Sequence, residues 1–152
     1  IRRYDALTGE EAWAFEVPDI AYSREAETGL VASPAVGQNS VDDLVYFTVT
    51  NGTENATVYA LQKSTGAVTW SQTLESPTVS SPVVVYNLLG DAWLVQAESN
   101  GTLSLMNAKT GKIVNTLQLE GEVESSPAVY RDVLVIATTG EDESYIYGIQ
   151  LQ

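Results

Sequence analysis

An all-β fold, built as a partial β-propeller of about three four-stranded antiparallel blades, is predicted from three observations. A Thr-Gly pair and a Ser-Pro pair recur along the chain, beginning at Thr8, Thr65 and Thr110 and at Ser33, Ser81 and Ser126. In the two clean copies, both pairs repeat after 45 positions. The segments between them are short, rich in β-branched and aromatic residues, and bounded by turn residues, with no sustained helical period. A fixed period of this length is typical of a propeller blade.

Each repeat is predicted to contain the same strands in the same order. A Ser-Pro strand comes first, followed by a long apolar strand and an Asn-Gly-type turn. A short strand, the Thr-Gly turn and a strand with a large aromatic residue complete the unit. The long apolar strands are expected at 44–49, 92–97 and 133–137, and the short strands at 57–61 and 102–106. Because each small sheet has two apolar faces, we expect the sheets to stack on one another around an axis.

The repeats divide a single domain, residues 1–152, into successive blades. Two complete blades are expected at 30–74 and 79–118. Residues 1–17 supply the end of a preceding blade, and 123–152 form a three-stranded terminal blade. The first copy is longer, because Ser33 follows Thr8 by 25 positions, whereas Ser81 follows Thr65 by 16. Its extra residues fall in the polar stretch 18–29, which we interpret as a surface insertion.

The stretch from Ala60 to Trp70, with Thr65-Gly66 inside it, resembles the tryptophan-docking repeat of the quinoprotein (PQQ-binding-like) β-propeller family. The run Ser-Ser-Pro-Ala-Val at 125–129 resembles the innermost strand of the same repeat. The resemblance covers essentially the whole chain. It implies a longer parent protein, commonly eight-bladed, of which this chain is a C-terminal fragment that begins mid-repeat.

The resemblance also implies structural roles for the recurring residues. Trp13 and Trp70 are expected to dock on the Thr-Gly turns of neighbouring blades, where the turn glycines are Gly9, Gly66 and Gly111. The third copy departs from the pattern, because Val114-Asn115 stands where the others have Trp, and we expect a weaker joint there. Trp93 lies in a long apolar strand and is expected in the core.

Composition excludes several classes of partner. The net charge of −13 and the pI near 4.1 disfavour nucleic acid and anionic membrane surfaces. No stretch reaches a transmembrane length, so membrane insertion is not expected. The absence of cysteine removes disulfides and is compatible with the cytoplasm or with a secreted bacterial domain. Members of the resembled family are mostly exported, which implies an extracellular, periplasmic or cell-surface location in a bacterium or archaeon.

The residue types present leave little room for catalysis. Without His or Cys there is no Ser-His-Asp or Cys-His system and no ordinary zinc site. Carboxylates cluster at 42–43, 120–124 and 141–143, but none has the spacing of an EF-hand. We therefore expect no catalytic, cofactor or metal site. Three N-glycosylation sequons begin at Asn51, Asn55 and Asn100, and we favour the reading of Asn-Gly as a hairpin turn.

Two functional hypotheses from different classes remain. The first is a non-catalytic scaffold or protein-interaction module that needs no cofactor. The second, implied by the resemblance, is part of a PQQ-dependent dehydrogenase whose PQQ and Ca²⁺ residues lie mainly outside this chain. The vicinal Cys pair of the family's alcohol dehydrogenases is absent. The sequence does not identify a protein partner. A partial propeller leaves open blade edges, through which we expect a homodimer, or a ring if the contact is head-to-tail. The alternative is a monomer, which the like charge of −13 per chain favours.

Overall fold

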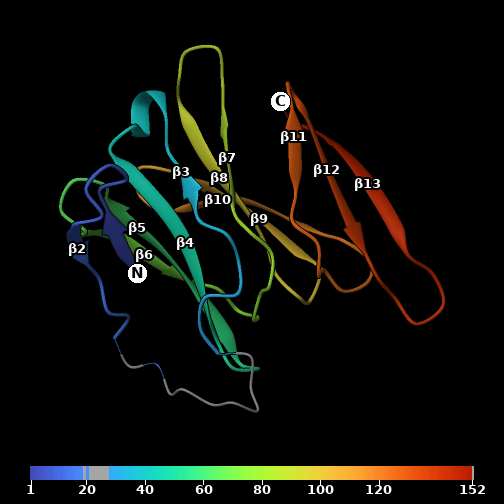
Figure 1. Ribbon diagram of the computed structural model, residues 1–152. Coiled ribbons are helices and arrows are strands. Elements are labelled where there is room, and N and C mark those ends of the chain that lie inside the picture. Colours follow the sequence, from blue (N-terminus) through green and yellow to red (C-terminus); the bar gives the residue numbers. More distant parts are fainter. Residues whose placement is uncertain (19, 21–27, 152) are drawn as a thin grey trace.

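The computed structural model describes residues 1–18, 20 and 28–151, and within them almost all regular structure is β-strand (Figure 1). One 3₁₀ turn, η1, covers Asn39–Val41. The strands are β1 (Arg2–Tyr4), β2 (Glu11–Ala14), β3 (Ala35–Val36), β4 (Leu44–Asn51), β5 (Asn55–Gln62), β6 (Val68–Thr73), β7 (Val83–Tyr86), β8 (Ala92–Ala97), β9 (Thr102–Asn107), β10 (Ile113–Gln118), β11 (Ala128–Tyr130), β12 (Val133–Thr138) and β13 (Tyr145–Gln150). The described part of the chain contains no helix with the length and hydrophobicity needed to traverse a bilayer.

The strands form four antiparallel sheets that follow one another in chain order. A two-stranded sheet, β1-β2, is followed by the four-stranded sheets β3-β4-β5-β6 and β7-β8-β9-β10 and by the three-stranded sheet β11-β12-β13. Figure 1 shows the progression from the blue N-terminal hairpin to the red C-terminal sheet. The all-β fold class and the partial propeller are thus confirmed. Most of the expected insertion at 18–29 lies outside the described residues.

The sheets repeat in register as well as in order. Ala60 on β5 pairs with both Tyr46 on β4 and Trp70 on β6. Leu105 on β9 pairs in the same way with Val95 on β8 and Asn115 on β10. A shift of register follows the Thr-Gly turn in both sheets. The pairings therefore identify residues that occupy the same place in successive blades.

The inner ends of the blades are linked by a serine ladder, made of Ser33, Ser81 and Ser126. The backbone N–H of Ser33 donates to the Ser81 Oγ at 2.9 Å. The backbone N–H of Ser81 donates in turn to the Ser126 Oγ, also at 2.9 Å. Each serine of the recurring Ser-Pro pair thus lies at a contact between two blades.

Three apolar clusters fill the spaces between successive sheets. The first contains Phe47, Val49 and Leu61 and packs against the N-terminal segment. The second joins β3–β6 to β7–β10, and the third joins β7–β10 to β11–β13. The far face of the terminal sheet has no such cover among the described residues. Its Val133, Val135 and Ile146 are 38%, 43% and 79% exposed.

Candidate functional site

We call the contact between two successive sheets a blade joint. The first joint lies between β1-β2 and β3–β6, the second between β3–β6 and β7–β10, and the third between β7–β10 and β11–β13. Tryptophans close the first two joints. The Trp13 Nε1 donates to the backbone carbonyl of Lys63 at 2.8 Å. The Trp70 Nε1 donates to the carbonyl of Ala108 at 3.0 Å, and the Trp70 side chain is 9% exposed. In both cases the acceptor lies in the next blade, just before its Thr-Gly turn. The two indoles therefore make the same contact across successive joints.

The glycines of the Thr-Gly turns allow the rings to lie against the backbone. Gly9, Gly66 and Gly111 share a positive φ of 73–74°, which L side chains rarely adopt. A Cβ atom built on Gly66 would lie 2.7 Å from the Trp13 ring, and one on Gly111 would lie 2.5 Å from the Trp70 ring. A Cβ on Gly9 would meet nothing within 4 Å. Among the residues that the structure describes, no ring therefore docks on the first turn.

The third joint lacks its tryptophan and opens into a groove. Asn115 takes the place of Trp70 in the register, and its side chain is exposed. A space of about 1330 Å³ lies between β7–β10 and β11–β13. Val95, Leu103, Leu105, Leu134 and Ile149 supply its apolar walls. We call this space the third-joint groove.

Two further features mark the rim of the third-joint groove. Trp93, expected in the core, is only partly buried and lines the groove, because no large ring from β10 covers it. Leu88, in the turn between β7 and β8, also lines the groove and is fully exposed. The neighbouring Leu89 is 88% exposed. The groove therefore continues onto an apolar hairpin tip, at the loop between β7 and β8 in Figure 1.

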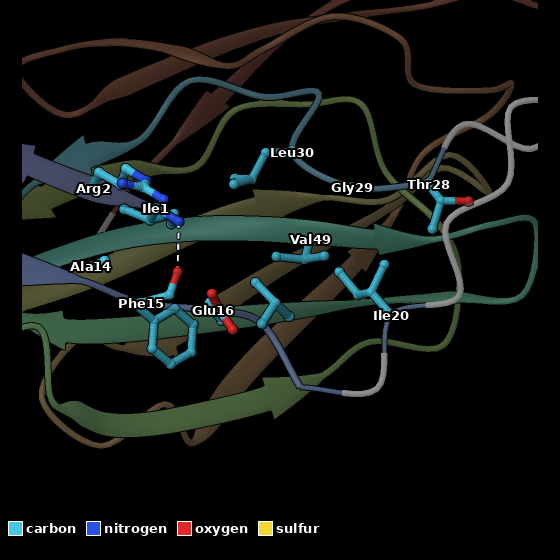
Figure 2. A pocket seen from close by; sticks show the side chains of 11 residues that line it. Ile1, Arg2, Ala14, Phe15, Glu16, Ile20, Thr28, Gly29, Leu30 and Val49 are labelled. Atoms are coloured by element: carbon cyan, nitrogen blue, oxygen red, sulfur yellow. Dashed lines mark hydrogen bonds between the residues drawn. The ribbon is translucent and has the colours of Figure 1, made fainter.

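A smaller pocket of about 560 Å³ lies between the N-terminal segment and β4 (Figure 2). Phe15, Ile20 and Val49 are among its lining residues. The Ile1 ammonium donates to the Phe15 carbonyl at 2.7 Å, the dashed line in Figure 2. Arg2, at its edge, is already bound to Glu11 at 2.6 Å. This pocket therefore presents no free cation or nucleophile among its described residues.

A buried polar network at the second joint was not anticipated from the sequence. Glu98 is 3% exposed, and its carboxylate accepts backbone N–H groups from Glu75 and Ser76 at 3.1 and 3.0 Å. The Ser104 hydroxyl donates to it at 3.3 Å. Burial raises the pKa of Glu98 above its ordinary value. The strand pairings place Glu98, directly after β8, at the position that Val49 occupies in the preceding blade. The replacement of this Val by Glu is the feature of the sequence from which the network could have been predicted.

Carboxylates in the described chain do not converge on a metal-binding arrangement. The pairs and triplets at 42–43, 120–124 and 141–143 have exposed side chains, and no three described acidic residues are grouped closely enough to hold an ion. Trp13 and Trp70 use their rings and N–H groups in the joints. Trp13 and Trp70 therefore serve as joint residues, and the described carboxylates form no group that could supply Ca²⁺ ligands.

The chain matches a known protein family over more than half of its length. The model of PQQ-like repeats described as outer membrane protein assembly factor BamB matches residues 1–92. Relatives extend the similarity across the rest of the chain. The outer membrane protein assembly factor BamB of Yersinia pestis is 26% identical over 157 aligned residues, covering 100% of this chain and 36% of the relative. That of Moranella endobia is 27% identical, covering 81% and 29%.

A mammalian protein shares part of the similarity. The β-alanine-activating enzyme of Mus musculus is 29% identical over 102 residues, which cover 66% of this chain and 9% of the enzyme. The chain thus spans about a third or less of the length of the curated relatives that it matches.

A solved structure shares the fold. The crystal structure of BamB from Moraxella catarrhalis superposes with a TM-score of 0.65 at 16% identity, covering 93% of this chain and 37% of that one. The similarity in sequence and in fold points to the same family of repeats. The chain therefore belongs to the PQQ-like β-propeller repeat family described as outer membrane protein assembly factor BamB.

Proposed function

We propose that the chain is a non-catalytic, cofactor-free scaffold segment that binds proteins during outer-membrane protein assembly, at the periplasmic face or surface of a bacterial cell. The family match supports this class of function. The observation that carries the proposal is the open third-joint groove beside the exposed Leu88 and Leu89, because contiguous exposed apolar surface of this kind marks protein-interaction sites.

Deletion of the coding segment in the organism that encodes it tests this proposal. We expect the outer-membrane fraction to contain less outer-membrane protein, as quantified by mass spectrometry, and a plasmid copy to restore it. A copy with Leu88→Ser and Leu89→Ser should restore less, because the apolar hairpin tip is removed. Leu7→Ser is the matched control, since Leu7 is 97% exposed on a different turn. An unchanged outer-membrane composition after deletion would contradict the proposal.

A biochemical experiment separates the scaffold from a dehydrogenase segment. The purified chain is mixed with PQQ and Ca²⁺, and absorbance and melting temperature are recorded. Since a ligand that binds the native state raises its melting temperature, a scaffold should show no change in either. A quinone absorbance shift, or turnover of a simple alcohol, would favour the dehydrogenase.

A further inference from the structure

Two aromatic rings close the second joint from within the chain. Tyr46 on β4 and Trp70 on β6 lie with ring centroids 5.8 Å apart, and both are buried. The Tyr46 hydroxyl and the Trp70 Nε1 donate to the same carbonyl, that of Ala108, each at 3.0 Å. This joint is therefore filled and hydrogen-bonded without any partner.

Both rings are missing at the corresponding places of the third joint. The pairings place Val95 where Tyr46 stands, and Asn115 where Trp70 stands. Val95 has no ring and no hydroxyl, and Asn115 is too short to cover the space that an indole covers. These two exchanges remove two rings from the joint, while Trp93 and Leu105 stand where the second joint has Leu44 and Ala60. The third-joint groove lies where the two rings are lost.

The hydrogen-bond acceptor of the joint is nevertheless retained. At the second joint, Ala108 donates its backbone N–H to the Ala92 carbonyl at 3.1 Å. At the third joint, Leu151 donates its N–H to the Asp132 carbonyl at 2.7 Å, in the same register. The Leu151 carbonyl thus corresponds to that of Ala108, and no described side chain donates to it. Leu151 also lines the groove.

We propose that the third-joint groove binds a tryptophan side chain of a partner polypeptide, whose indole takes the place of the missing ring and donates its N–H to the Leu151 carbonyl. This inference rests on the proposed scaffold function and names the chemistry of the partner. Two internal tryptophans already make this contact at the other joints. The groove continues their row of contacts, which is the reason for choosing an indole over other apolar groups.

The size and surroundings of the groove favour a polypeptide over a small molecule. Its volume of about 1330 Å³ is larger than the roughly 300–1,000 Å³ of small-molecule sites. The exposed Leu88 extends the apolar surface beyond the groove. The charged residues that line the groove, Arg131 and Asp132, are of opposite sign, so the preference for Lys or Arg beside the tryptophan comes from the net charge of −13 of the chain as a whole. The expected ligand is therefore a basic segment that carries a tryptophan.

A peptide titration of the purified full chain tests the inference. The probe is the acetylated and amidated peptide Lys-Ser-Trp-Ser-Lys, and its control has Ala in place of Trp. Binding is followed by calorimetry and by the methyl NMR signals of Val95 and Leu105. We expect saturable binding and methyl shifts with the tryptophan peptide. The alanine peptide should bind at least about tenfold more weakly, because the ring accounts for most of the buried apolar area.

Two variants of the chain locate the binding. Asn115→Trp restores the repeat's own ring and should abolish peptide binding. Val114→Trp adds the same ring at the adjacent position, which is 49% exposed and does not line the groove, and should bind as the wild type does. A folded Asn115→Trp variant that still binds would overturn the inference. So would equal binding of the two peptides, or unmoved Val95 and Leu105 methyl signals.

The wild-type titration decides the question even if Asn115→Trp fails to fold. It also separates the two proposals, because it uses only the purified chain. If the peptide does not bind but deletion still lowers the amount of outer-membrane protein, tryptophan binding in the third-joint groove is rejected and the scaffold function is retained.

Discussion

The six-membered ring of Trp70 lies directly over the Cα of Gly111, where a Cβ atom would be 2.5 Å from the ring. The indole N–H of Trp70 is fixed by the Ala108 carbonyl, three residues before that glycine. Ring and turn therefore belong to different blades but form one packed unit. The contact explains why a flexible-looking turn residue and a distant aromatic residue recur together in the sequence.

Trp70→Ala should destabilise the chain by roughly 3–5 kcal/mol, the range for truncating a large buried aromatic residue. The variant loses ring packing on Gly111 and leaves one donor fewer at the Ala108 carbonyl. Denaturant unfolding measures the free energy. Trp93→Ala is the matched control and should cost less, because Trp93 is only partly buried. A loss below about 1 kcal/mol for Trp70→Ala would show that the ring is not a structural joint.

Gly111→Ala should cost more than the roughly 1–2 kcal/mol of placing a Cβ at a positive φ. The additional cost arises because the new methyl group would displace the Trp70 ring. A double-mutant cycle measures it by denaturant unfolding. In the Trp70→Ala background, the cost of Gly111→Ala should fall to that of the backbone conformation alone. Additive losses would mean that ring and turn are energetically independent.

Glu98→Gln should flatten the dependence of stability on pH. The folded chain holds the Glu98 proton more tightly than the unfolded chain, whose glutamates titrate near 4.5. Stability therefore falls as the pH rises from 4.5 through the raised folded pKa, since the unfolded state releases its proton first. Gln keeps an acceptor for the N–H groups of Glu75 and Ser76 and has no proton to release.

Unfolding free energies between pH 4.5 and neutrality provide the measurement. Glu54→Gln removes one charge from an exposed side chain and controls for the change in net charge. If the wild type and Glu98→Gln lose the same stability over this range, burial of Glu98 does not contribute to the pH dependence.

The exposed face of the terminal sheet predicts self-association. Val135 and Ile146 lie on this face, 43% and 79% exposed, and apolar area left in water costs about 25 cal/mol per Å². The charge of −13 per chain opposes contact between copies, so moderate salt should increase the dimer fraction by screening it. Light scattering at high protein concentration, with and without salt, measures the mass.

Val135→Lys places a charge on the terminal face and should shift the mass toward the monomer. Val68→Lys adds the same charge on β6, where Val68 is 46% exposed, and should leave the mass unchanged. A strictly monomeric wild type at high concentration in salt would rule out the dimer.

Local repetition explains how much of the fold could be read from the sequence. Thr65-Gly66 and Thr110-Gly111 mark equivalent turns, and a turn of fixed geometry also fixes the register of the strands on either side of it. The strand order and the sheet class follow from these turns and the apolar runs between them. The spacing from the Thr-Gly turn also shows from the sequence that Asn115 stands where the other copies have Trp.

The groove could not be predicted, because it depends on which side chains meet across two sheets. Alternation along β8 shows that Val95 faces a neighbouring blade, but not that the opposing residues leave a gap. Trp93 was misplaced for this reason, since its own strand resembles a buried one. Glu98 was missed because a single acidic residue after an apolar strand is typical of an exposed turn.

The serine ladder gives the stack of blades a direction. Ser81, in the middle, accepts from the Ser33 N–H through its hydroxyl and donates its own backbone N–H to the Ser126 hydroxyl. The Ser33 end of the ladder therefore offers an acceptor, and the Ser126 end offers a donor. Two copies related by a two-fold axis would set like ends together and interrupt the ladder. Only a head-to-tail arrangement continues it, so any assembly that uses this inner contact is polar, and it either closes into a ring or grows from one end.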